Sequence, residues 1–214
     1  MYNIKYRNML KEIQMMKCYN EIDFIAASLA NYYLELEDSV IVLFESKNFS
    51  GLPYVIRGQY EVILQILYLL EHVEVDVEEC EKRARCYAFF HLLQKQELWH
   101  ESGNEEHEQH FKQIIESSYM DIKKEFRSTK RYRDFPYWFT LFKGPASFNQ
   151  LEKYLKFNHM ENVNYGLLSQ ICHGKTTIGS NTIPDYRWED ISRSMSNSFG
   201  ERLLPFAFSK SLNF

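Results

Sequence analysis

Helical hydrophobic periodicity runs through almost the whole chain and restricts its fold more than any other feature. Across residues 20–47 the apolar side chains recur at intervals of three and four, which places them on one face of a helix. Residues 53–73 are apolar on nearly all sides, as is typical of a helix at the centre of a bundle. Strand-like alternation is nearly absent, so the sequence predicts an all-α fold.

The residues that interrupt this pattern divide it into a bundle of about seven helices. Glycine and proline are few, eight and five in 214 residues, so the helices between them are expected to be long. We expect one domain over residues 1–214, with an irregular C-terminal segment at 174–214 that includes a loop at 174–187. Helices are expected at 3–17, 20–47, 53–73, 77–101, 105–127, 147–160, 162–173 and, as a short last helix, 188–198.

Cysteine usage and hydropathy bear on the cellular compartment. The four cysteines form no CxxC pair, and Cys80 and Cys86 lie too close on one predicted helix to form a disulfide easily. The first residues lack the continuous apolar core of a signal peptide. The longest apolar stretch is broken by Glu61 and Gln65 and is too short to span a bilayer. We therefore expect free thiols, no membrane span and a cytoplasmic location.

The charge of the chain disfavours a general nucleic-acid-coating role, since the net charge is −4 and the pI is about 6.0. Residues 123–133, however, carry six basic side chains and a single acidic one. Such a run is usually a solvated face or loop, and binding of RNA or another anion is the alternative.

Polar side chains form a stripe along the otherwise apolar central helix. Arg57, Glu61, Gln65 and Tyr68 fall at positions i, i+4, i+8 and i+11, which share one face. A buried arginine needs a charged partner, so one interpretation is a structural ion pair that fixes helix register. The other is an anion or substrate site, in which Arg57 supplies the charge and Glu61 orients it or acts as a base.

A second polar face is expected near the end of the chain. Tyr165, Ser169 and His173 are spaced by four along an apolar segment, and Gly174 ends that helix. The helix dipole favours protonation of a histidine at a C-terminus, so His173 is a candidate general acid or base. Core or capping roles are the alternative for each residue, and no Ser-His-Asp triad is implied.

A third group lies on the helix predicted at 77–101, where Arg83, Tyr87 and His91 share a face. These residues and Arg85 are candidates for ligand binding. Arg85 and His91 are separated by five residues, which loosely matches the Arg-x(4–6)-His signature of HEPN ribonucleases. Those enzymes cleave RNA without metal at a dimer interface. On a straight helix, positions six apart point about 240° from each other, so the two side chains would need a bend between them.

Metal and cofactor motifs are absent from the sequence. The spacing of His107 and His110 would allow transition-metal binding, but their acidic, hydrophilic surroundings favour a solvated turn between helices. The scattered glycines form no phosphate-binding loop, and no zinc-finger, EF-hand or HExxH pattern occurs. We expect neither a metal nor a cofactor.

Three segments in order give the chain a resemblance to a bacterial helical family, catalogued as domain of unknown function fifty-six seventy-seven. They are Arg57-Gly-Gln-Tyr-Glu61, Lys82-Arg-Ala-Arg-Cys-Tyr87 and Tyr165-x3-Ser169-x3-His173-Gly174. The resemblance covers about residues 20–180. It implies an all-α fold, a shared polar pocket, a relation to HEPN-like bundles, and a role in phage defence or toxin systems. The segment after His173 departs from the family pattern, being shorter and more irregular.

Two functions remain open at this point. In the first, the three polar faces converge in one cleft that binds or acts on RNA or a nucleotide phosphate, as in a metal-independent ribonuclease. Its catalytic candidates are Arg57, Glu61, Tyr165, Ser169 and His173. In the second, the polar faces are structural networks in a non-catalytic helical module that forms homo-oligomers or binds a protein partner through the aromatic tail at 206–214.

Overall fold

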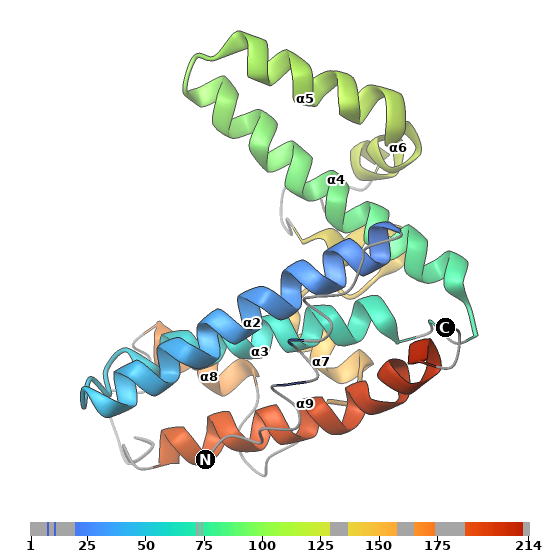
Figure 1. Cartoon of the computed structure of the whole chain (residues 1–214). Helices are drawn as coiled ribbons and strands as arrows, with labels where there is room; N and C mark the ends of the chain where they lie inside the picture. Colours follow the sequence, from blue (N-terminus) through green and yellow to red (C-terminus); the bar gives the residue numbers. More distant parts are fainter. Residues whose placement is uncertain are drawn as a thin grey trace.

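A computed structural model of the chain describes residues 8, 11, 20–71, 73, 75–128, 137–157, 165–173 and 187–211, without the side chains of 187, 189 and 203–211. These residues form eight α-helices and one 3-10 helix, and no strand occurs among them (Figure 1). The all-α prediction is confirmed. The helix expected at 3–17, Cys18, most of the loop expected at 174–187 and the side chains of the aromatic tail lie outside the described part.

The described residues contain nine helical elements. In chain order they are α2 (Glu21–Glu45), α3 (Leu52–Leu70), α4 (Val77–Glu101), α5 (Glu105–Ser118), α6 (Met120–Ser128), the 3-10 helix η2 (Trp138–Lys143), α7 (Phe148–Tyr154), α8 (Tyr165–Cys172) and α9 (Arg187–Ser211).

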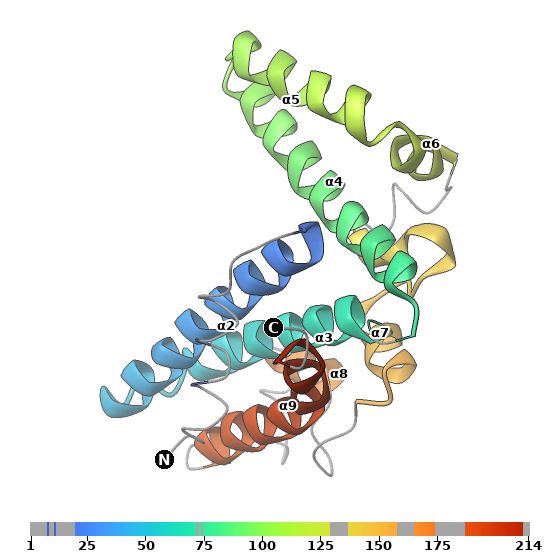
Figure 2. The same cartoon turned by 45° about the vertical axis from the view of Figure 1, so that its right-hand side comes forward.

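Helix α3 is the centre of the molecule. It packs against α2, α4, α7, α8 and α9, and most of its side chains are buried, as its apolar sequence predicts. Figures 1 and 2 show α2 alongside α3, with α9 on the other side of the body. The core therefore surrounds α3, and most of the polar side chains on this helix face another element of the fold.

Helix α9 attaches to this body through both apolar and polar contacts. Trp188, Ile191, Met195 and Phe199 follow the three–four spacing of a helix face, and all are buried. Between them, Ser192 Oγ donates to Gln59 of α3 at 2.9 Å, and Ser196 Oγ lies 2.6 Å from the Tyr33 hydroxyl of α2. The chain thus closes the bundle with its last described helix.

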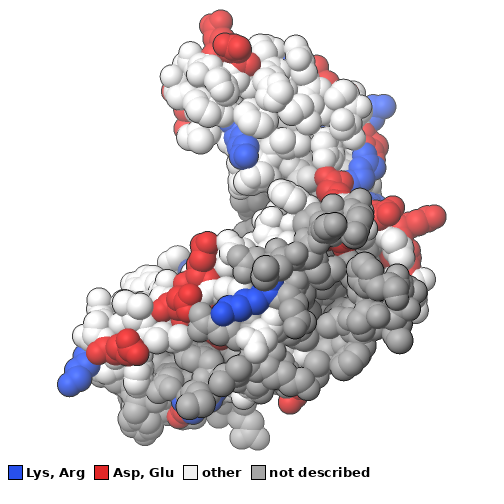
Figure 3. Space-filling view, viewed as in Figure 1, with Lys and Arg blue, Asp and Glu red and all other residues white. Residues whose placement is uncertain are grey.

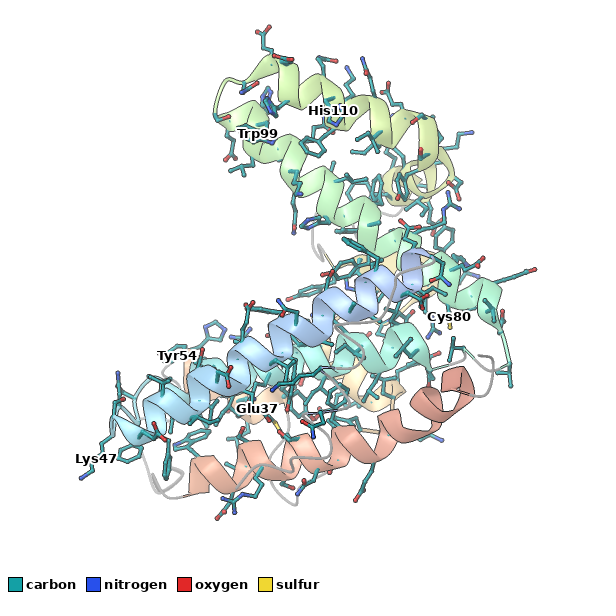
Figure 4. The ribbon with its side chains drawn as sticks, in the orientation of Figure 1. Glu37, Lys47, Tyr54, Cys80, Trp99 and His110 are labelled. Carbon is teal, nitrogen blue, oxygen red and sulfur yellow. The ribbon has the colours of Figure 1, made fainter. Side chains whose placement is uncertain are left out.

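Helix α4 leaves the body and carries an arm formed with α5 and α6 (Figures 1 and 2). Phe89 and Phe90 of α4 pack against Phe126 of α6, with ring centroids 5.2 and 5.3 Å from it. Trp99 and His110, which lie on α4 and α5, mark the outer part of this arm in Figure 4. Beyond Phe90, none of the residues of α4 is buried.

Side-chain caps explain why several helices begin where the sequence predicted. Asn20, Asp76, Asn104 and Ser147 each accept a hydrogen bond from the backbone N–H three residues later, which satisfies one of the free donors of the first turn. The bounds expected for α4 agree with the structure. Those expected for α2 and α3 are within three residues of the observed ones.

The helix predicted over 105–127 is two helices, α5 and α6, separated at Tyr119. Two tertiary contacts hold this break. Arg85 of α4 donates to the carbonyl of Ser118 at 2.9 Å, and the Tyr119 hydroxyl donates to Glu21 of α2 at 2.6 Å. The bend brings Ile122 and Phe126 of α6 into the core.

The C-terminal segment is more regular than expected. The predicted short helix at 188–198 is too short, because α9 continues to Ser211 and includes Gly200 and Pro205. Both residues are unfavourable inside a helix, but the buried face described above secures α9 against the body from Trp188 to Phe199. Helix α7 is shorter than the predicted 147–160 and ends at Tyr154.

The charged side chains are dispersed over the surface. Figure 3 shows both signs on one face, with acidic groups gathered over α2. Of the expected basic run at 123–133, Lys123 forms an ion pair with Glu116 at 3.0 Å, and 129–133 lie outside the described residues. No helix in the described ranges is both long and apolar enough to cross a membrane.

The central position of α3 gives a direct test of where the core lies. Leu64 of α3 is fully buried, whereas Leu98 of α4 is 60% exposed. We expect Leu64→Ala to lower the free energy of unfolding by about 2–5 kcal/mol, because it removes buried methyl groups and leaves a cavity. We expect Leu98→Ala to change it by less than about 0.5 kcal/mol. Urea unfolding followed by circular dichroism measures both, and equal losses would contradict this core.

Candidate functional site

The polar stripe of α3 faces the layer formed by η2, α7 and α8. Arg57 and Glu61 contact Tyr165 of α8, and Gln65 accepts a 2.9 Å hydrogen bond from the indole N–H of Trp138 in η2. Tyr68, at the other end, packs with its ring centroid 5.6 Å from that of Tyr154 in α7. The stripe is therefore one shared face, and its side chains meet different partners along its length.

At the N-terminal end of the stripe, three predicted site residues form a closed set of contacts. Arg57 Nε donates to Glu61 Oε1 at 2.9 Å, and an Nη of Arg57 donates to the Tyr165 hydroxyl at 3.1 Å. That hydroxyl in turn donates to Glu61 Oε1 at 3.0 Å. The side chains of Arg57 and Glu61 are each about a quarter exposed, so solvent reaches this cluster.

Tyr165 is held in place by the aromatic side chains around it. Its ring centroid lies 5.2 Å from that of Phe148, and the residue is 6% exposed. Burial and the adjacent Glu61 carboxylate raise the pKa of Tyr165 to about 12, although the neighbouring Arg57 opposes this shift. The phenol therefore remains protonated at neutral pH and acts as a hydrogen-bond donor to Glu61.

Tyr60 and Glu152 extend this cluster and were not identified from the sequence. Glu152 Oε1 accepts hydrogen bonds from the Tyr60 hydroxyl and, at 3.2 Å, from the backbone N–H of Tyr165. Burial and the Glu152 carboxylate raise the pKa of Tyr60 above its usual range. Glu152 thus fixes the first turn of α8. No sequence signal pointed to it, because it lies on α7, more than ninety positions from Tyr60.

Ser169 and His173 do not join Tyr165 in the cluster. Successive residues of a helix are about 100° apart, so each step of four turns about 40° further around the axis. The face of α8 that meets α3 carries the buried Tyr165 and Leu168 and also Cys172, whose thiol donates to the Pro53 carbonyl at 3.5 Å. His173, two steps of four from Tyr165, is exposed, and Ser169 is half-buried. His173 lies at the solvent edge, beside the residue that contacts Pro53.

At the C-terminal end of α3, Arg83 of α4 is the centre of a second polar cluster. Its guanidinium donates to the Tyr68 carbonyl at 2.5 Å and to the Tyr154 hydroxyl at 3.2 Å, and lies 3.9 Å from the centre of the Tyr68 ring. Glu79 and Glu71 lie 3.3 and 3.5 Å from its nitrogens. Arg83 is 6% exposed, so these contacts compensate a buried charge.

The two clusters are separate. Arg57 and Tyr68 are eleven residues apart on α3, which corresponds to about 17 Å at 1.5 Å per residue. No residue of the Arg83 cluster contacts Arg57, Glu61 or Tyr165 among the interactions described above. The three polar faces expected to converge in one cleft are therefore not joined. Arg57, Glu61 and Tyr165 meet at one end of the stripe and Arg83 lies at the other. The other members of the predicted cleft, Tyr87, Ser169 and His173, belong to neither cluster.

The remaining ligand-binding candidates lie on α4 with different neighbours. Tyr87 packs edge-on against Trp138, with ring centroids 5.5 Å apart. Arg85 forms a two-pronged ion pair with Asp121 of α6, at 2.9 and 3.0 Å. His91 lies on the surface, and partial loss of hydration together with the nearby charge of Lys95 lowers its pKa. Within this chain, Arg85 and His91 are thus not brought together.

Metal binding finds no support in the described ranges, where no three histidine, cysteine or acidic side chains are grouped to hold an ion. His100 pairs with Glu108 at 3.0 Å, and His107 contacts Asn104 at 3.0 Å. Cys80, Cys86 and Cys172 are free thiols, as expected. Burial raises the pKa of Cys86 to about 12, so this thiol is not a nucleophile at neutral pH.

The geometry of the first cluster predicts energetic coupling between its members. Tyr165→Phe removes the hydroxyl that links Arg57 and Glu61 but keeps the packed ring, so we expect the free energy of unfolding to fall by about 1–2 kcal/mol. In a double-mutant cycle with Glu61→Gln, the loss in the double mutant should differ from the sum of the two single-mutant losses by at least about 0.5 kcal/mol. Tyr54→Phe is the matched control, since Tyr54 is 60% exposed and lies on α3, the helix that carries Arg57 and Glu61. Additive losses would show that the three side chains do not act together.

Comparison with known proteins places the chain in a family without assigning an activity. A search of curated proteins and a search of solved structures found no significant match. The Family of unknown function (DUF5677) matches residues 23–183, which include both polar clusters and extend past His173. Because this match covers most of the chain, the protein belongs to the DUF5677 family.

Proposed function

We propose that this protein is an effector of the phage-defence or toxin type that binds and cleaves RNA without a metal, at the cluster of Arg57, Glu61 and Tyr165. The observation that carries the proposal is a partly exposed arginine whose orientation is fixed by a carboxylate and a phenol. A guanidinium has five N–H donors, so its contacts with Glu61 and Tyr165 leave donors that a phosphate can use.

Two further features fit this proposal. His173 is exposed and directly follows Cys172, which contacts Pro53 in the first turn of α3, and an imidazole there can exchange a proton with the ribose hydroxyl or the leaving oxygen of an RNA bound at Arg57. Glu61 already accepts two hydrogen bonds at Oε1, so in this arrangement it positions Arg57, and His173 is the better candidate for proton transfer. The free thiols Cys80, Cys86 and Cys172 are compatible with the cytoplasmic location that an RNA-directed effector requires.

A non-catalytic interaction module is the second candidate. The observation that favours it is the arm: beyond Phe90 no residue of α4 is buried, and Leu98 is 60% exposed. A helical pair with so few buried side chains gains stability when a second copy or a protein partner covers it. In that case the Arg57 cluster is a structural network that holds α8 on α3.

RNA integrity in cells and with purified protein distinguishes these functions. We expect the wild type to cleave RNA and His173→Ala to lose at least about a hundredfold in rate, because general acid–base groups contribute that much or more. Arg57→Lys should also lose activity, since an ammonium cannot make the paired contacts of a guanidinium.

His100→Ala is the matched control, because His100 is an exposed histidine on the arm and should leave cleavage unchanged. Cleavage that survives His173→Ala but is lost in His91→Ala would move the site to an HEPN-type arrangement of Arg85 and His91 between two copies. If the folded wild type leaves RNA intact, the interaction module is the better account.

A further inference from the structure

A pocket open to solvent lies at the C-terminal end of α3, away from the Arg57 cluster. It has a volume of about 540 Å³ and is lined by the ends of α3, η2 and α7, the first turns of α4 and the residues that follow η2. Cys80 marks those turns of α4 in Figure 4. Pockets of this size hold small organic ligands, so this one has room for more than an inorganic ion. The residues that line it include Arg83, Lys143, Lys153, Tyr154, Phe142 and Glu79.

Arg83 supplies a fixed positive charge in the wall of the pocket. Its side chain is 7% exposed and is held by the Tyr68 carbonyl, the Tyr154 hydroxyl and the carboxylates of Glu79 and Glu71. The charge is therefore already desolvated and oriented before any ligand arrives. A preorganised arginine of this kind binds phosphate at a smaller entropic cost than a mobile one.

Two exposed lysines add to this charge at the rim. Lys143 and Lys153 line the pocket, and neither forms an ion pair with any residue in the described part of the chain. Glu79 is the single carboxylate among the lining residues, against three cationic side chains. Counting Glu71, which also pairs with Arg83, three cationic side chains stand against two carboxylates, so the pocket keeps a net positive charge in a chain whose net charge is −4. Its arginine and lysines together suit a group with more than one negative charge, such as a phosphate monoester.

The backbone at the rim has an unfavourable conformation. Phe142 and Lys143 have φ values of 50° and 64°, in the left-handed region that non-glycine residues seldom adopt. Gly144 follows, where a Cβ atom would lie 1.9 Å from the Phe139 carbonyl oxygen, so no other residue fits. Residues held in such conformations are concentrated at ligand-binding sites, where the surrounding structure maintains them.

An aromatic side chain offers a surface for the rest of the ligand. Tyr154 is 45% exposed, and its ring is edge-on to Tyr68, with centroids 5.6 Å apart. This contact fixes the ring while leaving part of it uncovered. Nucleic acid bases stack on exposed aromatic rings whatever their sequence.

We propose that this pocket binds a nucleoside phosphate, with Arg83, Lys143 and Lys153 around the phosphate and Tyr154 against the base. The site is distinct from the cluster proposed to cleave RNA and does not depend on it. A nucleotide seated here would contact α3, α4 and α7 together.

Isothermal titration calorimetry with the full chain tests this proposal. The titrants are the four ribonucleoside 5′-monophosphates, the parent nucleosides and inorganic phosphate. At least one monophosphate should bind the wild type at least ten times more tightly than its parent nucleoside does. It should also bind at least ten times more tightly than inorganic phosphate. The variant with Lys143→Gln and Lys153→Gln should lose at least tenfold in affinity for that monophosphate. Both lysines are exposed, so the fold should tolerate this change.

The matched control carries Lys47→Gln and Lys124→Gln, which remove the same charge from exposed lysines outside the pocket; Lys47 lies at the far end of the body (Figure 4). It should bind as the wild type does. Arg57→Gln should also bind normally, and loss of nucleotide binding in that variant would place the ligand at the other cluster and overturn the inference. Absence of binding to the wild type at millimolar nucleotide would overturn it as well. Equal affinity for inorganic phosphate and nucleotide would show that the pocket binds an anion but not the base, and this result would contradict the proposal.

Discussion

The burial of α3 is the constraint on which the rest of the structure depends. A helix with most of its surface buried places many of its polar groups away from water, and such groups need hydrogen-bond partners on neighbouring elements. These partners also determine which elements pack on α3 and in what register. Gln59 pairs with Ser192 of α9, Tyr60 with Glu152 of α7, Glu61 with Tyr165 of α8, and Gln65 with Trp138 of η2. The polar contacts of one helix therefore arrange the C-terminal half of the chain.

The length of α3 separates the chemistry of its two ends. At one end, Arg57 is partly exposed and held by Glu61 and Tyr165, an arrangement suited to contact with a phosphate at the surface. At the other end, Arg83 is buried in the wall of an open pocket. Both arginines are oriented by carboxylates and tyrosines, and the second has a cavity of ligand size beside it.

Much of the fold could be predicted from the sequence, and much of the site could not. Helical periodicity and capping residues are local, and they located α2, α3 and α4 closely. The break at Tyr119 depends on Arg85 and Glu21, which are distant in sequence, and the position of α9 depends on its packing against α2 and α3. For the site, the spacing of four correctly grouped Arg57 with Glu61 on α3. The same spacing also grouped His173 with Tyr165, although the two side chains point in different directions, because each step of four turns further around the helix axis. Glu152, Lys143 and Lys153 reach the two clusters only through tertiary structure.

The most direct test of two separate sites is an NMR titration that follows the Nε–Hε signals of Arg57 and Arg83. This account predicts that a nucleoside monophosphate shifts the Arg83 signal and the backbone amides of Phe142, Lys143 and Gly144, and leaves Arg57 unchanged. A short single-stranded RNA should shift the Arg57 signal and the amides of Tyr165 and His173. If both ligands shift the same set of signals, the two ends of α3 do not form separate sites and the account is contradicted.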